Sequence, residues 1–244
     1  MKVIKPSQVI EKSKQSVATS PNTSPPEPEP ALVILVDKPY GWTSFAVVKK
    51  VKWLGKFRKI GHAGTLDPLA TGLLICCTGK MTKQIDSYQA QVKEYTGTFV
   101  LGKTTPSFDL ETAVDAEYPT EHITTDAIQE VAKRLTGAIQ QVPPVFSAIK
   151  IDGKRAYKSA RKGQEVVIEP RTVHIYELEV DASNFPEIAF RVVCSKGTYI
   201  RSLARDFGVL LNSGAYLSSL RRTRIGDFRV EDAKTIEALE KENV

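Results

Sequence analysis

The sequence has few residues of the kinds that bind metal ions or form cross-links, with three cysteines and three histidines among 244 residues. Cys76 and Cys77 are adjacent, Cys194 is far away in the chain, and none stands in a C-x-x-C pair. An odd number of cysteines in this arrangement argues against a disulfide framework and against a zinc cluster. We therefore expect a fold held together by its hydrophobic core.

Long apolar runs are also missing. No stretch approaches the roughly 18 apolar residues of a membrane-spanning helix, and the N-terminus lacks the apolar segment of a secretory signal. The composition, 41% hydrophobic and 25% charged, is that of a globular protein with a core of its own. We expect a cytoplasmic protein with no membrane partner.

The charge balance favours an anionic partner. The chain carries 34 basic and 28 acidic residues, for a net charge of +6, and lysine or arginine releases counterions when it neutralises a phosphate. Six basic residues lie just ahead of a glycine-rich segment: Lys49, Lys50, Lys52, Lys56, Arg58 and Lys59. This basic cluster is either a nucleic-acid-binding surface or an ordinary solvated helix face.

The chain divides by composition into three parts. Residues 1–30 are rich in Ser, Thr, Lys, Pro and Glu and end in a proline-glutamate repeat, so we expect a disordered tail. Residues 31–230 would form one catalytic domain, because single domains commonly run to about 100 to 200 residues. Residues 231–244 have room for one short terminal helix.

Local patterns predict a mixture of strands and helices. A helix capped by Thr43 or Ser44 should bury Val47, Val48, Val51 and Leu54, and Gly61–Gly72 should form a loop. Strands are predicted over 32–36, 73–77, 95–101, 173–180 and 188–194, and further helices over 125–136 and 198–211. Because strands and helices do not alternate regularly, we expect an α+β fold with a largely antiparallel central sheet.

The segment Gly61–Gly72, with the sequence GHAGTLDPLATG, is the most informative in the chain. Its three glycines let the backbone approach a ligand closely, and Asp67 stands in its middle. Taken alone, an aspartate before a proline is more often a turn or helix-cap residue, and His62 a structural histidine. The spacing by itself leaves these alternatives open.

The same segment resembles the signature of the TruB family of tRNA pseudouridine synthases, and the resemblance extends from about Leu32 to Arg229. The other matching elements are LVDKPYGWTS at 35–44, KEY at 93–95, QVPPVFSAIK at 141–150, CSKGTYIR at 194–201 and LRRT at 220–223. The resemblance implies a pseudouridine synthase fold and activity on uridine 55 in the T loop of tRNA.

The resemblance also implies a role for each matching residue. Asp67 would be the essential carboxylate, Arg201 the cation paired with it, and Tyr95 the ring stacked on the target base. Three further residues would bind substrate: Tyr199 and Lys38 would shape the pocket, and Leu220 would line it. His62 would help to hold the nucleotide flipped out of the loop. Without the family, the tyrosines are packing aromatics and the charged residues solvated surface groups.

The implied reaction explains these residue types. Uridine becomes pseudouridine when its N1–C1′ bond breaks and the uracil rejoins the ribose through C5, without redox change, so no metal or other cofactor is expected. An ionised aspartate can act as the nucleophile or as a base on the ribose, and the sequence leaves both roles open. The target must be extruded from the RNA loop, and an aromatic face replaces its lost stacking.

The sequence departs from many bacterial members of the family, because about fifteen residues follow Arg229 where those proteins carry a C-terminal RNA-binding (PUA-like) module. Affinity for the T arm should then rest on the catalytic domain, including a segment at 106–164 that in relatives contains a mobile insertion. We expect a monomer with no obligatory protein partner. The alternatives are a guide-dependent synthase acting on another RNA and a chaperone that folds tRNA, which could also coexist with catalysis.

Overall fold

The computed structural model describes residues 29–145, 150–151, 154–155 and 168–242. The predicted tail up to residue 28, and residues 146–149 of the QVPPVFSAIK element, lie outside the described residues.

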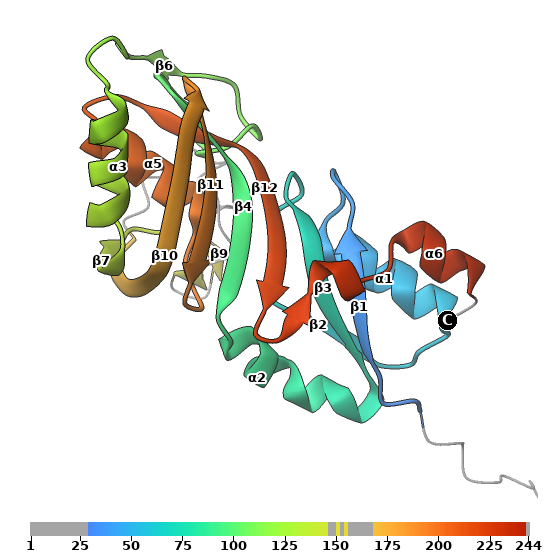
Figure 1. Ribbon diagram of the computed structural model, residues 1–244. Helices are drawn as coiled ribbons and strands as arrows, with labels where there is room; N and C mark the ends of the chain where they lie inside the picture. Colours follow the sequence, from blue (N-terminus) through green and yellow to red (C-terminus); the bar gives the residue numbers. More distant parts are fainter. Residues whose placement is uncertain (1–28, 146–149, 152–153, 156–167, 243–244) are drawn as a thin grey trace, which may run out of the picture.

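A central sheet runs through the whole fold (Figure 1). Its order is β1 (Val33–Lys38), β3 (Thr71–Thr78), β12 (Ala215–Ile225), β4 (Lys93–Leu101), β11 (Glu187–Cys194), β10 (Arg171–Asn184) and β7 (Gly137–Gln141); β2 (Ile60–Ala63) pairs with β3, and β13 (Phe228–Arg229) with β12. Two small hairpins pair β5 (Lys103–Thr104) with β6 (Ala116–Glu117), and β8 (Lys150–Ile151) with β9 (Lys154–Arg155). Among the described strands, β12 and β3 are parallel and the other neighbours antiparallel, which confirms the predicted α+β class.

Helices lie at several places along the sheet, as Figure 1 shows. The helical elements are α1 (Ser44–Leu54), η1 (Gly79–Gln84), α2 (Ile85–Ala90), α3 (Thr125–Arg134), α5 (Ile200–Leu210), η2 (Val230–Asp232) and α6 (Ile236–Lys241). Helices α3 and α5 lie at the end of the sheet formed by β10 and β11, whereas α1 and α6 lie beside β1. The fold therefore has more than one apolar core.

The larger core lies between α5, α3 and the antiparallel strands. Helix α5 buries Leu203 and Phe207 completely, and Phe207 packs against Phe99 of β4, whose ring stacks on Phe190 at 4.1 Å. The predicted helix over 198–211 is confirmed at Ile200–Leu210, and its apolar residues Ile200, Leu203, Ala204 and Phe207 are buried. Because this packing fixes α5, it also fixes the residues in its first turn, which belong to the site described below.

A second core joins α1 and α6 to β1 and β3. Val47, Val48 and Val51 are buried there, as their helical spacing predicts. Thr43 is the N-cap, since its side chain accepts a hydrogen bond from the Ala46 amide at 3.0 Å. This leaves the Ser44 hydroxyl available for another contact.

The predicted loop over Gly61–Gly72 is wrong at both ends. Residues 61–63 belong to strand β2, and 71–72 begin β3, so the loop is confined to 64–70. Glycine disfavours a strand locally, but pairing with β3, which is buried except at Thr71, supplies hydrogen bonds to the backbone of β2. The short loop is consequently anchored by a strand on each side.

Strand β12 has no counterpart among the predicted elements, although it stands in the middle of the sheet. Its sequence contains Arg221, Arg222 and Arg224 and reads as polar. At Gly72, where φ is +99°, an added Cβ would lie 2.3 Å from the Arg222 carbonyl oxygen. Glycine is thus required where β3 and β12 run together, and this contact places the 64–70 loop beside β12. The sequence likewise did not predict β7 or α2.

Among the described residues, no helix is both long and apolar enough to cross a membrane.

The start of the described chain is held to the core, and this predicts different effects for two truncations. The Thr78 hydroxyl donates to the Pro30 carbonyl at 2.6 Å, and the Lys59 amide donates to the Glu29 carboxylate at 2.7 Å. Removing residues 1–28 should leave the melting temperature unchanged, because their composition supports no core. Removing residues 1–30 should cost roughly 1 to 3 kcal/mol, at about 0.5 to 1.5 kcal/mol per hydrogen bond. Thermal unfolding of the two truncated proteins checks this, and equal melting temperatures would contradict it.

Candidate active site

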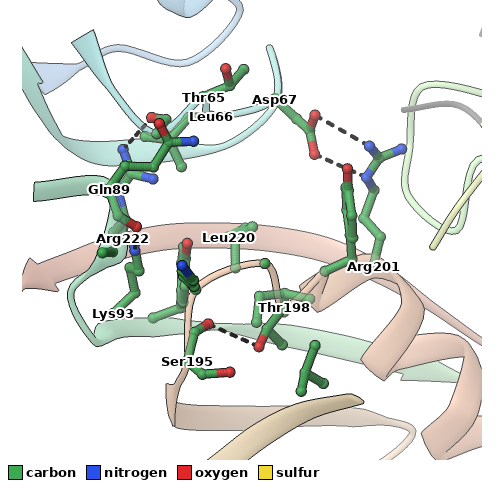
Figure 2. Close-up of a pocket in the computed structure, with 18 of the residues that line it drawn as sticks. Thr65, Leu66, Asp67, Gln89, Lys93, Ser195, Thr198, Arg201, Leu220 and Arg222 are labelled. Atoms are coloured by element: carbon green, nitrogen blue, oxygen red, sulfur yellow. Dashed lines mark hydrogen bonds and ion pairs between the residues drawn. The ribbon is translucent and has the colours of Figure 1, made fainter. Parts of the chain in front are cut away.

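A cavity of about 750 Å³ opens between the 64–70 loop, the start of α5 and strands β4 and β12. Its volume lies within the range of pockets that hold small-molecule ligands or single nucleotides. The lining combines Gly64–Asp67 with residues from α2, β4, β10, β12 and the turn before α5 (Figure 2). Segments far apart in the sequence therefore converge on one site.

Asp67 and Arg201 form a two-pronged ion pair at this cavity, as Figure 2 shows. The Nε of Arg201 lies 2.9 Å from Oδ2 of Asp67, and Nη2 donates to Oδ1 at 3.2 Å. The Arg201 side chain is 3% exposed, whereas the Asp67 side chain is 37% exposed. A buried guanidinium thus holds an accessible carboxylate in a fixed orientation.

A second carboxylate shares Arg201, and the sequence did not point to it. Asp109 is buried with its Oδ2 3.6 Å from Arg201 Nε, and the Ser107 carbonyl accepts from Arg201 Nη1 at 3.3 Å. The hydroxyls of Thr105 and Ser107 donate to the Asp109 carbonyl at 2.7 and 3.1 Å. This 105–109 turn has no apolar periodicity, so no local signal reveals its role.

The surroundings of Asp67 act on its pKa in opposite directions. Burial raises the pKa of the Asp67 carboxyl above its ordinary value, and the Asp109 carboxylate raises it further, while Arg201 and Lys38 lower it. Burial has the largest effect, so this carboxyl holds its proton more tightly than an exposed aspartate does. Among the groups around Asp67, Arg201 has the largest effect in favour of the ionised form.

Lys38 lies beneath the loop rather than in the cavity lining. Its side chain is completely buried, and Nζ donates to the carbonyls of Pro39, Trp42 and Pro68 at 3.0, 2.5 and 3.2 Å. Burial lowers the pKa of Lys38 to about 8, with Arg222 also lowering it and Asp67 raising it. These contacts engage the three donors of Nζ and tie Lys38 to Pro68, next to Asp67, while its part in shaping the pocket stays a prediction.

Further contacts fix the other side of Asp67. The Ser44 hydroxyl accepts from the Leu66 amide at 2.9 Å and lies 3.0 Å from the Leu66 carbonyl, to which it donates. The Gly41 amide donates to the Pro68 carbonyl at 2.9 Å. Both neighbours of Asp67 are consequently tied to the segment that enters α1.

The structure brings four other predicted site residues together with Asp67. Tyr95 from β4, Tyr199 and Arg201 at the start of α5, and Leu220 from β12 all line the cavity. Tyr95 is buried, and burial raises the pKa of its hydroxyl. Tyr199 lies under the Arg171 guanidinium, 4.8 Å from the ring centre.

His62 is placed differently. It belongs to β2, paired with Cys76 of β3, and does not line the cavity. Burial lowers the pKa of its imidazole, and Arg222 lowers it further. Its predicted part in holding a flipped nucleotide stays a prediction.

Arg222 is the most connected pocket residue to which the sequence assigned no role. It is 1% exposed, and it donates from Nε to the Leu73 carbonyl at 2.8 Å and from Nη2 to the Gly64 carbonyl at 3.0 Å. It also counteracts burial at Tyr95, lowering the pKa of a hydroxyl that burial raises. The LRRT element contained the signal, but a buried arginine cannot be told from a solvated one by sequence.

The cavity is electropositive. Its ionisable lining residues are the basic Lys93, Arg171, Lys196, Arg201 and Arg222 and the acidic Asp67 and Asp86. Burial lowers the pKa of Lys93 to about 8, with Arg222 contributing. The excess of cations suits a substrate that carries phosphates.

Comparisons with known proteins agree with this geometry. The model for the N-terminal domain of TruB family pseudouridylate synthases matches residues 52–200. The chain belongs to the TruB family. The model for the C-terminal domain of tRNA pseudouridylate synthase B matches residues 201–244, which here contain α5, β12 and α6.

Individual TruB relatives match almost end to end. The tRNA pseudouridine synthase B of Phocaeicola vulgatus is 58% identical over 212 residues, covering 84% of this chain and 90% of the relative. That of Flavobacterium johnsoniae is 57% identical over 215 residues, covering 85% and 94%. The implied family is thereby confirmed.

Solved structures confirm the pseudouridine synthase fold. A crystal structure of a Cbf5-Nop10-Gar1 complex matches with a TM-score of 0.66 and 33% identity, covering 84% of this chain. An H/ACA RNP bound to a substrate RNA containing 2′-deoxyuridine matches with a TM-score of 0.62 and 30% identity. The TruB chain spans about half the length of these two chains, 52% and 51%.

The buried contacts of Arg222 predict a large difference from its neighbour in β12. Arg222→Met should cost roughly 2 to 6 kcal/mol of stability, because it removes the donor from the buried Leu73 carbonyl and from the partly buried Gly64 carbonyl, at about 1 to 3 kcal/mol each. The matched control is Arg221→Met, since Arg221 is 41% exposed and pairs with Asp37 at the surface; it should cost less than about 1 kcal/mol. Urea unfolding of both variants measures this, and equal midpoints would show that the buried contacts do not matter.

Proposed function

We propose that this TruB protein converts uridine 55 in the T loop of tRNA to pseudouridine, with Asp67 as the reacting carboxylate. The observation that carries the proposal is the accessible Asp67 carboxylate, held by buried Arg201 in an electropositive cavity beside Tyr95. Relatives that are more than 50% identical over most of their length carry the name tRNA pseudouridine synthase B, which supports tRNA as the substrate.

The reaction is an isomerisation, and its atoms balance within the substrate. The N1–C1′ bond breaks, the uracil turns, a C5–C1′ bond forms, and the proton on C5 is exchanged for one on N1. Asp67 serves either as nucleophile or as base on the ribose, and both roles need the ionised carboxylate. Arg201 favours that form and aims both oxygens, and no cofactor is required.

The other lining residues would hold the extruded base. Tyr95 offers a ring on which uracil stacks, and Tyr199 and Leu220 enclose it. Lys196 and Arg171 lie where they can bind the phosphates that flank the flipped nucleotide. His62, which is not part of the cavity lining, would help to hold the nucleotide flipped out of the loop.

The Asp67 carboxylate, its partner Arg201 and the Tyr95 ring come together within one chain. We propose a cytoplasmic monomer with residues 31–230 as the catalytic domain and no obligatory protein partner. Light scattering of the free protein and of its tRNA complex tests the monomer.

The first test replaces Asp67 by asparagine, which keeps the shape of the side chain and removes its charge. Turnover should fall below detection, because neither nucleophilic attack nor proton removal is open to a neutral amide. Binding of unmodified tRNA should be retained, since phosphates and stacking provide the affinity. Pseudouridine formation and binding are measured on one transcript, with circular dichroism as a check of folding.

The matched control is Asp206→Asn, which breaks an Arg–Asp pair on α5 outside the cavity. It should turn over like the wild type. Product formation by a folded Asp67→Asn protein at a near-normal rate would overturn the proposal.

Two substitutions at Tyr95 separate its ring from its hydroxyl. Tyr95→Phe keeps the stacking face and should lose only what the hydroxyl contributes, whereas Tyr95→Leu should also lose roughly 1 to 3 kcal/mol of base stacking. Single-turnover rates and tRNA affinities measure both effects. Tyr176, an exposed residue of β10, provides the matched Tyr→Leu control. Wild-type behaviour of both Tyr95 variants would place Tyr95 outside the reaction.

A further inference from the structure

The exposed side of α1 carries aromatic rings that the fold does not use. Phe45 and Trp53 are 73% and 71% exposed, and Lys49 and Lys52 between them are exposed as well. At about 100° per residue these four side chains fall within an arc of roughly 100° on the helix. We call them the outer face of α1, opposite the valines that fill the core.

A groove of about 830 Å³ adjoins this face. Its charged lining residues are Lys49, Lys50, Lys52 and Lys56 with the single acid Glu240. Lys50 is paired with Glu240 and stands 5.0 Å from the Trp53 ring centre. The three other lysines leave the groove positively charged around an exposed indole.

Helix α1 begins at the active-site loop, because Ser44 binds both backbone groups of Leu66, next to Asp67. Trp53 follows nine residues later, a helical distance of about 14 Å. The cavity has room for about one nucleotide, so the rest of a folded RNA substrate must lie on the surface around it. The outer face of α1 is within reach of that RNA.

We propose that the outer face of α1 is a second RNA-contact surface, on which an unpaired base of the substrate stacks on Trp53 while Lys49, Lys52 and Lys56 bind phosphates. The proposal rests on the proposed function. Aromatic rings interleaved with lysines are typical of surfaces that bind single-stranded RNA. A protein interface core is depleted in lysine, and a membrane-surface helix needs a broad exposed apolar face, which α1 buries in the core.

Fluorescence tests the stacking directly. The chain has two tryptophans, so Trp42→Phe leaves Trp53 as the single reporter. Titration of this full-length variant with unmodified tRNA should quench its emission saturably. No change at saturation would overturn the proposal, and so would a blue shift on anionic phospholipid vesicles without a response to tRNA.

Affinity measurements test the contribution of the face. The variant Phe45→Ala/Trp53→Ala should bind tRNA roughly 5- to 100-fold more weakly, and Lys49→Ala/Lys52→Ala should flatten the salt dependence of binding by about 0.7 to 0.9 per lost phosphate contact. At saturating tRNA, kcat should stay at the wild-type value. The matched control is Tyr176→Ala/Lys133→Ala, which removes an exposed aromatic and an exposed lysine elsewhere.

Unchanged affinity and salt dependence in both α1 variants would overturn the proposal. The proposed function fails independently, if the wild type binds tRNA without forming pseudouridine.

Discussion

The pairing of a buried arginine with two carboxylates is the interaction on which the site depends. Removing a guanidinium from water is costly unless its donors are paired, and Arg201 is supplied with Asp67, Asp109 and the Ser107 carbonyl. Only Asp67 is substantially exposed. Asp109 and helix α5 therefore fix the position of the Arg201 side chain. Arg201 in turn fixes the orientation of the Asp67 carboxylate, which faces the cavity.

Such a pair is useful only if the loop that carries Asp67 is equally constrained. Lys38 and Ser44 bind the residues on either side of Asp67, and Arg222 binds the Gly64 carbonyl where the loop begins. Lys38 and Ser44 come from β1 and α1, which pack in one core, and Arg222 comes from β12, which packs in another. The fixed orientation of the Asp67 carboxylate thus depends on elements from different parts of the fold.

The sequence predicts those parts of the fold that bury apolar side chains with a regular period, such as α5 and β3. It misses β12 and the roles of Arg222 and Asp109. A charged side chain reads as solvated in sequence, and its burial depends on carbonyls and cations that distant segments supply. The site itself was found through the resemblance of GHAGTLDPLATG to a known family, because the spacing alone left Asp67 open to interpretation as a turn residue.

The lowered pKa values of two buried lysines predict that the site and the stability of the fold respond oppositely to alkaline pH. Burial lowers the pKa of Lys38 and of Lys93 to about 8, below the ordinary lysine value of 10.5. Between these values the unfolded chain binds more protons than the folded one, so stability rises with pH. In the same pH range Lys38 loses a proton and therefore one of its hydrogen bonds to backbone carbonyls. The Pro68 carbonyl is one of these acceptors. The buried Lys38 ammonium therefore lowers the stability of the fold near neutral pH. The same ammonium holds Pro68, beside Asp67, in place.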